Sequence, residues 1–372
     1  MPEPLSVGIV LPSNTIGGPQ KLSAIMAADL AQEGHHVTIF ASVLPHYYYY
    51  VTLGKRPIPW LKYVLHYVKA WALDRKFFFK ELLEDAKVSG QVRFRFVPRS
   101  ASKKQLNGLD CLVYHSIAQV EEYRNKFPQN RQIYLLHHLE EHNHGSREIF
   151  KQARRSFAGS ILVVSPFTAR EVAPDAPNAS MVVNPISLAV WAQRDTFDAD
   201  AGRRDILLFW KDYAAGLKGR DIVLQLQSMR PEATVTVWCR GSGNRALAEQ
   251  ALPGATIVEQ VSEKQLIDLY LGHSFLLFCS TFEGFGMPPI EALACGCIPV
   301  LNPDVGAAEL YARDGQNVIF LDEDAATVAG RLAGALNDPS ALQAMRLAGS
   351  ASIEAFNPDR YGQRLLEAAG FL

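Results

Sequence analysis

Residues 280–293 read STFEGFGMPPIEAL, and this stretch is the most informative part of the chain. The apolar run SFLLFC at 274–279 precedes it and predicts a buried strand. Gly284 and Gly286 permit a tight turn with close backbone approach, and the adjacent Pro288 and Pro289 favour the first turn of a helix. The sequence therefore predicts a strand, a glycine turn and a helix in succession.

The turn between this strand and this helix suits a nucleotide. The first turn of a helix has backbone N–H groups without helical partners and a partial positive charge, so it favours a diphosphate. Glu291, in the predicted helix, can accept hydrogen bonds from ribose hydroxyls, and Glu283 stands before the turn. A plainer interpretation makes Glu283 a solvated loop acid and Glu291 an acid favoured by the helix dipole. The combination with paired glycines and prolines favours a nucleotide-sugar site.

Length, composition and charge suit a two-domain α/β protein. The chain has 372 residues, 48% of them hydrophobic, and a formal net charge of −1, which does not indicate nucleic-acid binding. Its five cysteines show no paired spacing and are expected to be reduced core thiols, and Cys295 and Cys297 lack a second ligand pair for a metal. The amino terminus has no signal-peptide pattern, and no apolar run reaches the ~18 residues of a membrane span, so we expect a cytoplasmic location.

The hydrophobic pattern predicts two parallel sheets with helices between their strands. The expected strands of the first sheet are 5–11, 37–41, 91–97, 111–114, 132–136 and 160–164. The proline-rich segment 173–178 is predicted to be a hinge. The expected strands of the second sheet are 181–183, 205–209, 234–238, 256–258, 275–279 and 298–301. The fold class is therefore α/β, with two Rossmann-like, doubly wound parallel-sheet domains.

The stretch 280–293 resembles the signature of retaining glycosyltransferases of family 4, which have the GT-B fold. Glu283 and Glu291 stand eight positions apart around Gly-Phe-Gly, and DVGAAEL at 304–310 and DGQN at 314–317 continue the likeness. The resemblance implies two facing domains, an acceptor-binding one at 1–176 and a donor-binding one at 177–352. It also implies that a C-terminal helix within 353–372 packs back on the first domain.

Two further segments resemble places where the family holds the donor diphosphate. Gly17 and Gly18 resemble its first loop, although a tight turn is the plainer interpretation, and the spacing lacks the Gly-x-Gly-x-x-Gly pattern of a dehydrogenase. Lys211 and Lys218 resemble the family's Gly-Arg and Lys-Gly. Trp210 stands where the family has glycine, and lysine offers a point charge in place of arginine's fork. Solvated lysines in a polar loop are the alternative.

A polar cluster follows the predicted strand 132–136. His137 and His138 come directly after it, and two glutamates and two more histidines follow by residue 144. The cluster lacks the spacing of zinc-binding helices, and side chains at the carboxyl end of a parallel strand generally line a ligand crevice. By resemblance, His137 takes the place of the family's active-site histidine, with a structural loop histidine as the alternative. No metal is expected here.

The resemblance implies transfer of a hexosyl-type sugar from a nucleotide-sugar donor to an acceptor hydroxyl, with retention and without a metal or other cofactor. His137 and Glu283 take the catalytic roles. The residues assigned to the donor are Gly17, Gly18, Lys211, Lys218, Glu283, Gly284, Phe285, Gly286 and Glu291. Polysaccharide, lipopolysaccharide or glycoconjugate assembly is the expected setting. A nucleotide-sugar epimerase of GT-B fold and a non-catalytic nucleotide-sugar binding protein are the alternatives.

The segment 45–80 interleaves aromatic and basic residues. Trp60, Tyr67 and Trp71 fall at helical spacing, and Lys62 is one of the cations among them, a character found in interfacial membrane helices. We therefore expect peripheral contact with anionic lipid at the inner face of the membrane, where the segment presents a lipid-linked or other glycan acceptor. A buried helix face, or the wall of a pocket for a small-molecule acceptor, is the alternative interpretation.

Overall fold

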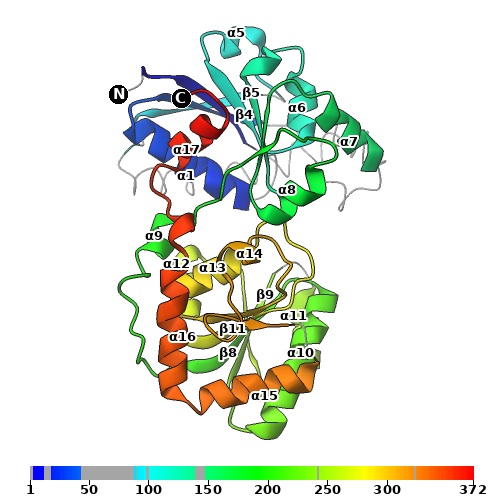
Figure 1. The fold of residues 1–372 in the computed structure, drawn as a ribbon, viewed down its shortest axis with the longest axis vertical. Coiled ribbons are helices and arrows are strands. Elements are labelled where there is room, and N and C mark those ends of the chain that lie inside the picture. Colours follow the sequence, from blue (N-terminus) through cyan, green and yellow to red (C-terminus); the bar gives the residue numbers. More distant parts are fainter. Residues whose placement is uncertain are drawn as a thin grey trace. The chain divides into compact units, whose positions relative to one another are not determined.

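The computed structural model describes residues 3–11, 18–42, 88, 90–97, 100–138, 147–240, 243–321 and 324–372. The chain divides into two compact units, each with its own parallel sheet (Figure 1). Unit 1 comprises Met1–Pro185 together with Pro358–Leu372, and unit 2 comprises Ile186–Asn357.

Unit 1 is built on a seven-stranded sheet with the order β3-β2-β1-β4-β5-β6-β7, and all its neighbouring strands are parallel. The strands are β1 (Ser6–Val10), β2 (His36–Ser42), β3 (Val92–Val97), β4 (Cys111–Tyr114), β5 (Gln132–Leu136), β6 (Ser160–Val163) and β7 (Ser180–Met181). Every residue of β4 and β5 is buried, as expected of central strands covered on both faces. The strand order reverses between β1 and β4, the kind of position where open α/β sheets bind ligands.

The helices of unit 1 include the last helix of the chain. Those that the structure describes are α1 (Gly18–Gln32), α5 (Lys103–Leu106), α6 (Ile117–Tyr123), α7 (Arg147–Arg155), α8 (Pro166–Val172) and α17 (Tyr361–Ala368), with a 3-10 helix at Gln129–Arg131. Helix α17, red in Figure 1, packs against the blue α1. The Asp29 carboxylate on α1 accepts hydrogen bonds from the backbone N–H groups of Arg360 and Gly362, at 2.9 and 2.8 Å. Asp29 thus caps the start of α17 and ties the C-terminal segment to unit 1.

Unit 2 is built on a six-stranded sheet with the order β10-β9-β8-β11-β12-β13, again with parallel neighbours. The strands are β8 (Arg204–Trp210), β9 (Val235–Cys239), β10 (Thr256–Glu259), β11 (His273–Phe278), β12 (Ile298–Leu301) and β13 (Ile319–Phe320). Here the order reverses between β8 and β11. The residues that follow these two strands therefore occupy the expected ligand position of this sheet.

The helices of unit 2 cover the sheet and enclose one apolar core. They are α9 (Leu188–Trp191), α10 (Tyr213–Met229), α11 (Asn244–Ala251), α12 (Glu263–Leu271), α13 (Met287–Ala294), α14 (Ala308–Tyr311), α15 (Ala325–Leu336) and α16 (Pro339–Ala351), with a 3-10 helix at Glu354–Phe356. Helix α10 lies very close to β8, because Gly216 faces the buried indole of Trp210. A Cβ at Gly216 would lie 2.0 Å from the indole Cε2, so only glycine fits there.

The predicted α/β fold with two parallel, doubly wound sheets is confirmed, but the predicted boundary between the domains is wrong. Residues 173–178 are not a hinge, since the N–H groups of Asp175 and Ala176 both bond to the carbonyl of Val172 and turn the chain at the end of α8. The chain then returns to the first sheet, where β7 pairs with β6. The segment 181–183 therefore does not begin the second sheet, and the boundary follows Pro185 in place of residue 176.

The return of the chain to unit 1 also differs from the prediction. Unit 2 continues to Asn357 in place of residue 352, because Phe356 is buried in its core against Phe285 and Tyr311, with ring centroids 5.8 and 5.7 Å apart. Strand β13 was not predicted from the sequence, since two residues carry too short a pattern to identify a strand.

All five cysteines are buried and unpaired, as predicted. Burial raises the pKa of Cys111, Cys279 and Cys297 to about 12 each, so these thiols stay protonated. Within the described ranges, no helix is long and apolar enough to cross a membrane. Trp60, Lys62, Tyr67 and Trp71 lie outside the described residues.

Candidate functional site

Polar residues from three neighbouring strand ends and from one nearby helix gather at the carboxyl edge of the unit 2 sheet. Lys211 follows β8, Ser280 and Glu283 follow β11, and Asn302 follows β12. Lys218 reaches the same edge from α10. We call these five residues the carboxyl-edge cluster. It stands where the strand order reverses, the place at which parallel sheets of this kind hold ligands.

Lys211 and Glu283 form an ion pair in this cluster. The Lys211 ammonium lies 2.6 Å from Glu283 Oε1 and 3.3 Å from the carbonyl oxygen of Phe282. The Ser280 hydroxyl donates to the same Glu283 oxygen, at 2.9 Å. The side chains of Lys211 and Glu283 keep 36% and 21% of their surface exposed, so a ligand can reach both.

Lys218 is held on the other side of the cluster. Its ammonium donates to the carbonyl of Leu321, at 3.1 Å, and lies 3.5 Å from the amide oxygen of Asn302. The Asn302 amide in turn donates to the Ser280 carbonyl, at 2.6 Å. The two lysines predicted to meet the donor diphosphate therefore lie at one sheet edge, linked through Asn302 and Ser280.

The predicted glycine turn and helix are both present. Helix α13 begins at Met287, and Gly286 before it has a φ of +78°, which favours glycine over other residues. Because Pro288 and Pro289 have no N–H, the first turn offers fewer donors to an anion than the sequence argument assumed. The donor groups of this turn are thus limited to the backbone before Pro288.

The glycine loop is fixed from behind by a second loop. The carbonyl of Phe285 accepts a hydrogen bond from the N–H of Ala307, at 2.9 Å. Gly306, with a φ of +61°, lies so close that a Cβ there would be 2.2 Å from the same carbonyl oxygen. The Phe285 ring is buried against Phe356. The side chain of Phe285 therefore anchors the loop, and only its backbone could contact a nucleotide-sugar donor.

Glu291 is buried on α13, with 4% of its surface exposed. The hydroxyl of Tyr270 on α12 donates to Glu291 Oε2, at 3.1 Å. Burial raises the pKa of Tyr270 well above its ordinary value, so the phenol remains a donor. The indole of Trp238 packs edge-on against the Tyr270 ring, with centroids 6.4 Å apart. This packing and the hydrogen bond hold the Glu291 carboxylate in one orientation.

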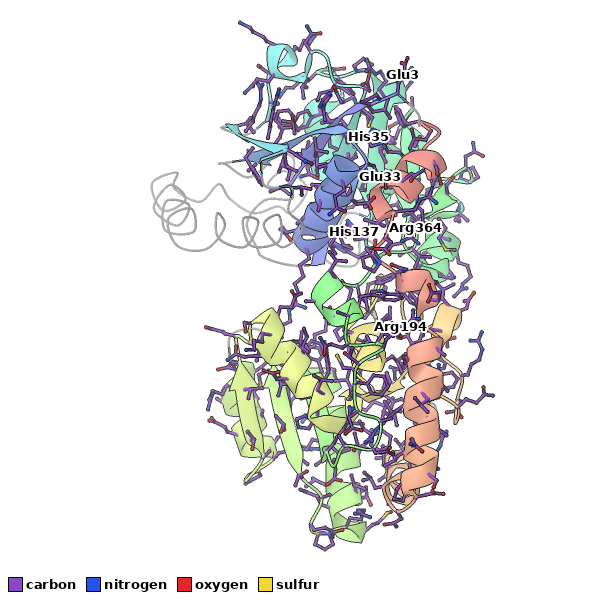
Figure 2. The ribbon with its side chains drawn as sticks, turned by 90° about the vertical axis from the view of Figure 1, so that its left-hand side faces the viewer. Glu3, Glu33, His35, His137, Arg194 and Arg364 are labelled. Carbon is purple, nitrogen blue, oxygen red and sulfur yellow. The ribbon has the colours of Figure 1, made fainter. Side chains whose placement is uncertain are left out.

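His137 directly follows β5 in unit 1 (Figure 2). Its side chain is buried, with 7% of its surface exposed. Its Nε2 lies 2.7 Å from Nδ1 of His115, which directly follows β4. His115 Nε2 lies 2.8 Å from the hydroxyl of Ser23 on α1. Burial lowers the pKa of His115 to about 3 and that of His137 well below its ordinary value, so both rings are neutral near pH 7.

Several predicted features lie outside the described residues. These are Gly17 and the polar residues at 140–144; Gly18 is the first residue of α1. Among the residues that the structure describes, no group of three or more histidine, cysteine, aspartate or glutamate side chains is arranged to hold a metal ion.

Sequence reasoning missed Ser280, Asn302, His115, Ser23 and Tyr270. The first three directly follow predicted strands or lie within two residues of them, so the argument that selected His137 from its place after a strand would also have selected them. Ser23 and Tyr270 lie inside helices and carry no comparable pattern. Only the folded chain brings them to His115 and Glu291.

The two units, each with a doubly wound parallel sheet, form an α/β fold of the GT-B class. Residues 242–351 match the family model described as glycosyl transferases group 1. The matched segment runs through the glycine loop and α13 to the end of α16, and so includes both Glu283 and Glu291.

Particular relatives match parts or all of the chain. The D-inositol 3-phosphate glycosyltransferase of Rhodococcus jostii is 28% identical over 172 residues, covering 41% of this chain and 37% of that protein. The GtfA subunit of the UDP-N-acetylglucosamine–peptide N-acetylglucosaminyltransferase of Streptococcus parasanguinis is 28% identical over 115 residues, covering 30% of this chain and 23% of that protein. The chain thus spans well under half of the length of these relatives.

The likeness in structure extends over the whole chain. Anabaena HepE, solved in complex with UDP and glucose, superposes with a TM-score of 0.71 and 12% sequence identity, covering 99% of this chain and 100% of that one. At this identity the likeness shows the GT-B fold alone.

Proposed function

We propose that this chain is a retaining glycosyltransferase that moves a hexosyl-type sugar from a nucleotide-sugar donor to an acceptor hydroxyl. The carboxyl-edge cluster carries the proposal, because it places two cations and a carboxylate at the reversal point of a parallel sheet, beside the glycine loop of α13. The match of residues 242–351 to glycosyl transferases group 1 supports the same conclusion.

The main chemical task in such a transfer is to stabilise the departing nucleoside diphosphate. Lys211 and Lys218 supply positive charge, and the loop backbone before Pro288 supplies N–H donors. On donor binding, the Lys211 ammonium exchanges part of its contact with Glu283 for a phosphate oxygen. Glu283 is then available to position the sugar hydroxyls.

Glu291 takes the ribose of the donor. A buried carboxylate held by Tyr270 has one oxygen oriented and can accept hydrogen bonds with little reorganisation. His137 keeps the role that the resemblance implies, a hydrogen bond to the sugar or the diphosphate. With lysines compensating the phosphate charge, the proposed reaction needs no divalent metal, and activity that disappears in EDTA would contradict this part of the proposal.

The first donor to test carries uridine. One relative is a subunit of a UDP-N-acetylglucosamine–peptide N-acetylglucosaminyltransferase, and one structural relative was solved with UDP and glucose. UDP, GDP, dTDP and ADP belong in one panel, with UDP first.

Thermal unfolding of the full chain with each nucleoside diphosphate tests the donor site. One nucleotide should raise Tm, because a ligand at ~100 times its dissociation constant adds about 2.7 kcal/mol of stability. Glu291→Gln should abolish most of this shift. Glu249→Gln, which changes an exposed glutamate on α11 of the same unit, is the matched control and should keep it.

Each result of the thermal unfolding experiment has a different meaning for the donor site. A selective shift that Glu291→Gln removes and Glu249→Gln retains supports the donor site and identifies the base. An equal shift in both variants contradicts the role of Glu291. No shift with any nucleotide or intact nucleotide sugar contradicts the proposal.

For the acceptor we propose a glycan or lipid-linked substrate in glycoconjugate assembly, reached by a chain that contacts anionic membrane peripherally from the cytoplasmic side. The aromatic and basic pattern at 45–80 is the sole basis for the membrane contact. Co-sedimentation with phosphatidylglycerol vesicles, absent with phosphatidylcholine vesicles, is the expected result. Equal sedimentation with both, or none with either, would contradict it.

A further inference from the structure

A buried chain of hydrogen bonds links helix α1 to the candidate active-site histidine of unit 1. Ser23 Oγ lies 2.8 Å from His115 Nε2, and His115 Nδ1 lies 2.7 Å from His137 Nε2. The two imidazole planes differ by only 9°, with ring centroids 5.0 Å apart. Ser23, His115 and His137 are 0%, 4% and 7% exposed, so water does not compete for these contacts.

His115, the middle residue of this series of hydrogen bonds, is fixed to the sheet. The backbone N–H of His115 donates to Gln119 Oε1, at 2.7 Å. The Gln119 amide donates to the carbonyls of Val10 and Leu11 at the end of β1, at 3.1 and 2.8 Å. His115 is therefore held at the point where the strand order of unit 1 reverses.

The geometry restricts where the protons can be. Each of the two hydrogen bonds needs one proton, and each neutral ring carries one N–H. If Ser23 donates to His115, then His115 carries its proton on Nδ1, and His137 must also carry its proton on Nδ1. If His115 donates to Ser23, both rings carry their protons on Nε2. The two rings must therefore share the same tautomer.

The series of hydrogen bonds ends at His137 Nδ1. His137 Nδ1 is buried and has no hydrogen-bond partner among the residues that the structure describes. In the first arrangement this nitrogen is a donor, which suits a phosphate or other acceptor oxygen. In the second it is an acceptor, which suits a sugar hydroxyl. The other end of the hydrogen-bond chain is the Ser23 hydroxyl, which can either donate to His115 or accept from it. Its role is thereby linked to that of His137 Nδ1.

We propose that Ser23 and His115 are positioning residues that couple the tautomer of His137 to that of His115, and so set whether its unpaired Nδ1 donates to the substrate or accepts from it. The functional part of this inference rests on the proposed glycosyl transfer. The tautomer itself is a property of unit 1 alone.

Long-range ¹H–¹⁵N NMR of the full chain labelled with ¹⁵N-histidine at pH 7.5 tests the tautomers directly. The spectra of His115→Gln and His137→Gln assign the two rings. Both rings should show the same tautomer, either both protonated at Nδ1 or both at Nε2. Different tautomers on the two rings, or a charged ring, would overturn the proposal.

Ser23→Ala tests transmission along the chain. Although Ser23 does not bond to His137, we expect the ¹⁵N shifts of both rings to change together, because His115 Nε2 loses its partner. Ser23→Thr keeps the hydroxyl and should restore the wild-type pattern. Ser160→Ala removes a hydroxyl of the same unit that bonds to the Ala369 carbonyl, and should leave both rings unchanged. An unchanged His137 ring in Ser23→Ala would refute transmission.

Turnover of the nucleotide sugar selected by the thermal panel tests the functional part. Ser23→Ala should lower kcat by about 10- to 100-fold, the range found when a residue that orients a metal-bound imidazole is removed. The KM for the donor should change little, and Ser23→Thr should restore kcat. A normal kcat in Ser23→Ala would overturn the positioning role. If no nucleotide binds, the proposed function fails. The NMR result still decides whether the hydrogen bonds from Ser23 to His137 couple the tautomers of the two rings.

Discussion

The ion pair between Lys211 and Glu283 joins two residues to which the proposed reaction gives different tasks. One neutralises phosphate and the other positions the sugar, yet their charged atoms lie 2.6 Å apart. Because both side chains are partly exposed, water screens the pair, and it adds only about 0–1 kcal/mol to stability. Under the proposed function, we therefore expect replacement of either residue to affect donor binding much more than folding.

Lys211→Met should leave Tm nearly unchanged and weaken binding of the stabilising nucleoside diphosphate. The loss of a charge-assisted hydrogen bond costs about 1.5–3 kcal/mol, roughly a 10- to 100-fold rise in Kd, measured by isothermal titration calorimetry. Lys264→Met, an exposed lysine on α12 of the same unit, is the matched control and should bind as wild type. Equal Kd values for the two variants would remove Lys211 from the donor site.

The element scale shows how glycine positions shape the site. Gly306 and Gly315 both have positive φ, at +61° and +71°, so alanine at either costs about 1–2 kcal/mol of backbone strain. They differ in surroundings, since a Cβ at Gly306 meets the Phe285 carbonyl and one at Gly315 meets no atom within 4 Å. Alanine at Gly315 therefore tests backbone strain alone, whereas alanine at Gly306 tests strain together with displacement of the glycine loop.

Gly306→Ala should therefore lose nucleotide binding and lower Tm by strain and clash together, while Gly315→Ala should keep binding with the smaller drop in Tm that strain alone causes. The expected rise in Kd for Gly306→Ala is at least about tenfold, because a displaced loop loses more than one hydrogen bond to the diphosphate. Calorimetric titration measures both variants. Normal binding by Gly306→Ala would show that the loop position does not matter for the donor.

A second glycine pair tests the packing of α10 on β8. Gly216→Ala should destabilise unit 2 by about 1–3 kcal/mol, because the new methyl meets the Trp210 indole. Gly330→Ala, inside α15 with no atom within 4 Å, should instead stabilise it by about 0.5–1 kcal/mol. Urea unfolding gives both values, and similar stabilities for the two variants would contradict this account of Trp210.

At this same scale the sequence predicted strands well and side-chain partners poorly. Strands β4, β5 and β12 have the predicted bounds, because their apolar runs are bounded by polar or turn residues. The two-residue strands β7 and β13 depend on pairing with β6 and β12, which no local pattern records. Trp210 departs from the family pattern, and only the structure shows that Gly216 leaves room for it.

For the candidate site too, the sequence predicted which residues follow strands but not which side chains contact each other. Sequence placed Lys211, Glu283 and His137 after strands, and the structure has them there. It could not predict that Glu283 pairs with Lys211, or that Phe285 turns its ring into the core. These depend on contacts between residues 72 and 71 positions apart in the chain.

At the scale of the whole molecule, stability should depend on pH through the buried histidines of unit 1. Burial lowers the pKa of His115 to about 3, against about 6.5 in the unfolded chain, and lowers that of His137 in the same direction. Between these values the unfolded chain binds a proton that the folded chain does not. Folding stability therefore falls as pH falls below about 6.5.

Urea unfolding of unit 1 between pH 7.5 and 5 measures this dependence. Each buried histidine contributes a slope of about 1.4 kcal/mol per pH unit below pH 6.5. His115→Gln should flatten the profile by about that amount. Ser160→Ala, which removes a hydroxyl of the same unit and no titratable group, should keep the wild-type profile. A wild-type stability that is flat down to pH 5 would contradict neutral, buried rings.

The central claim, that the chain transfers sugar from a nucleotide with retention, is tested most directly by ¹H NMR of an incubation with UDP-glucose and with other nucleotide sugars. The account predicts that one donor yields its nucleoside diphosphate and a sugar product with the anomeric configuration of the donor. Glu283→Gln should abolish this reaction, and Glu249→Gln should not. A bound donor that stays intact, or one converted to an epimeric nucleotide sugar without release of the diphosphate, would contradict the claim.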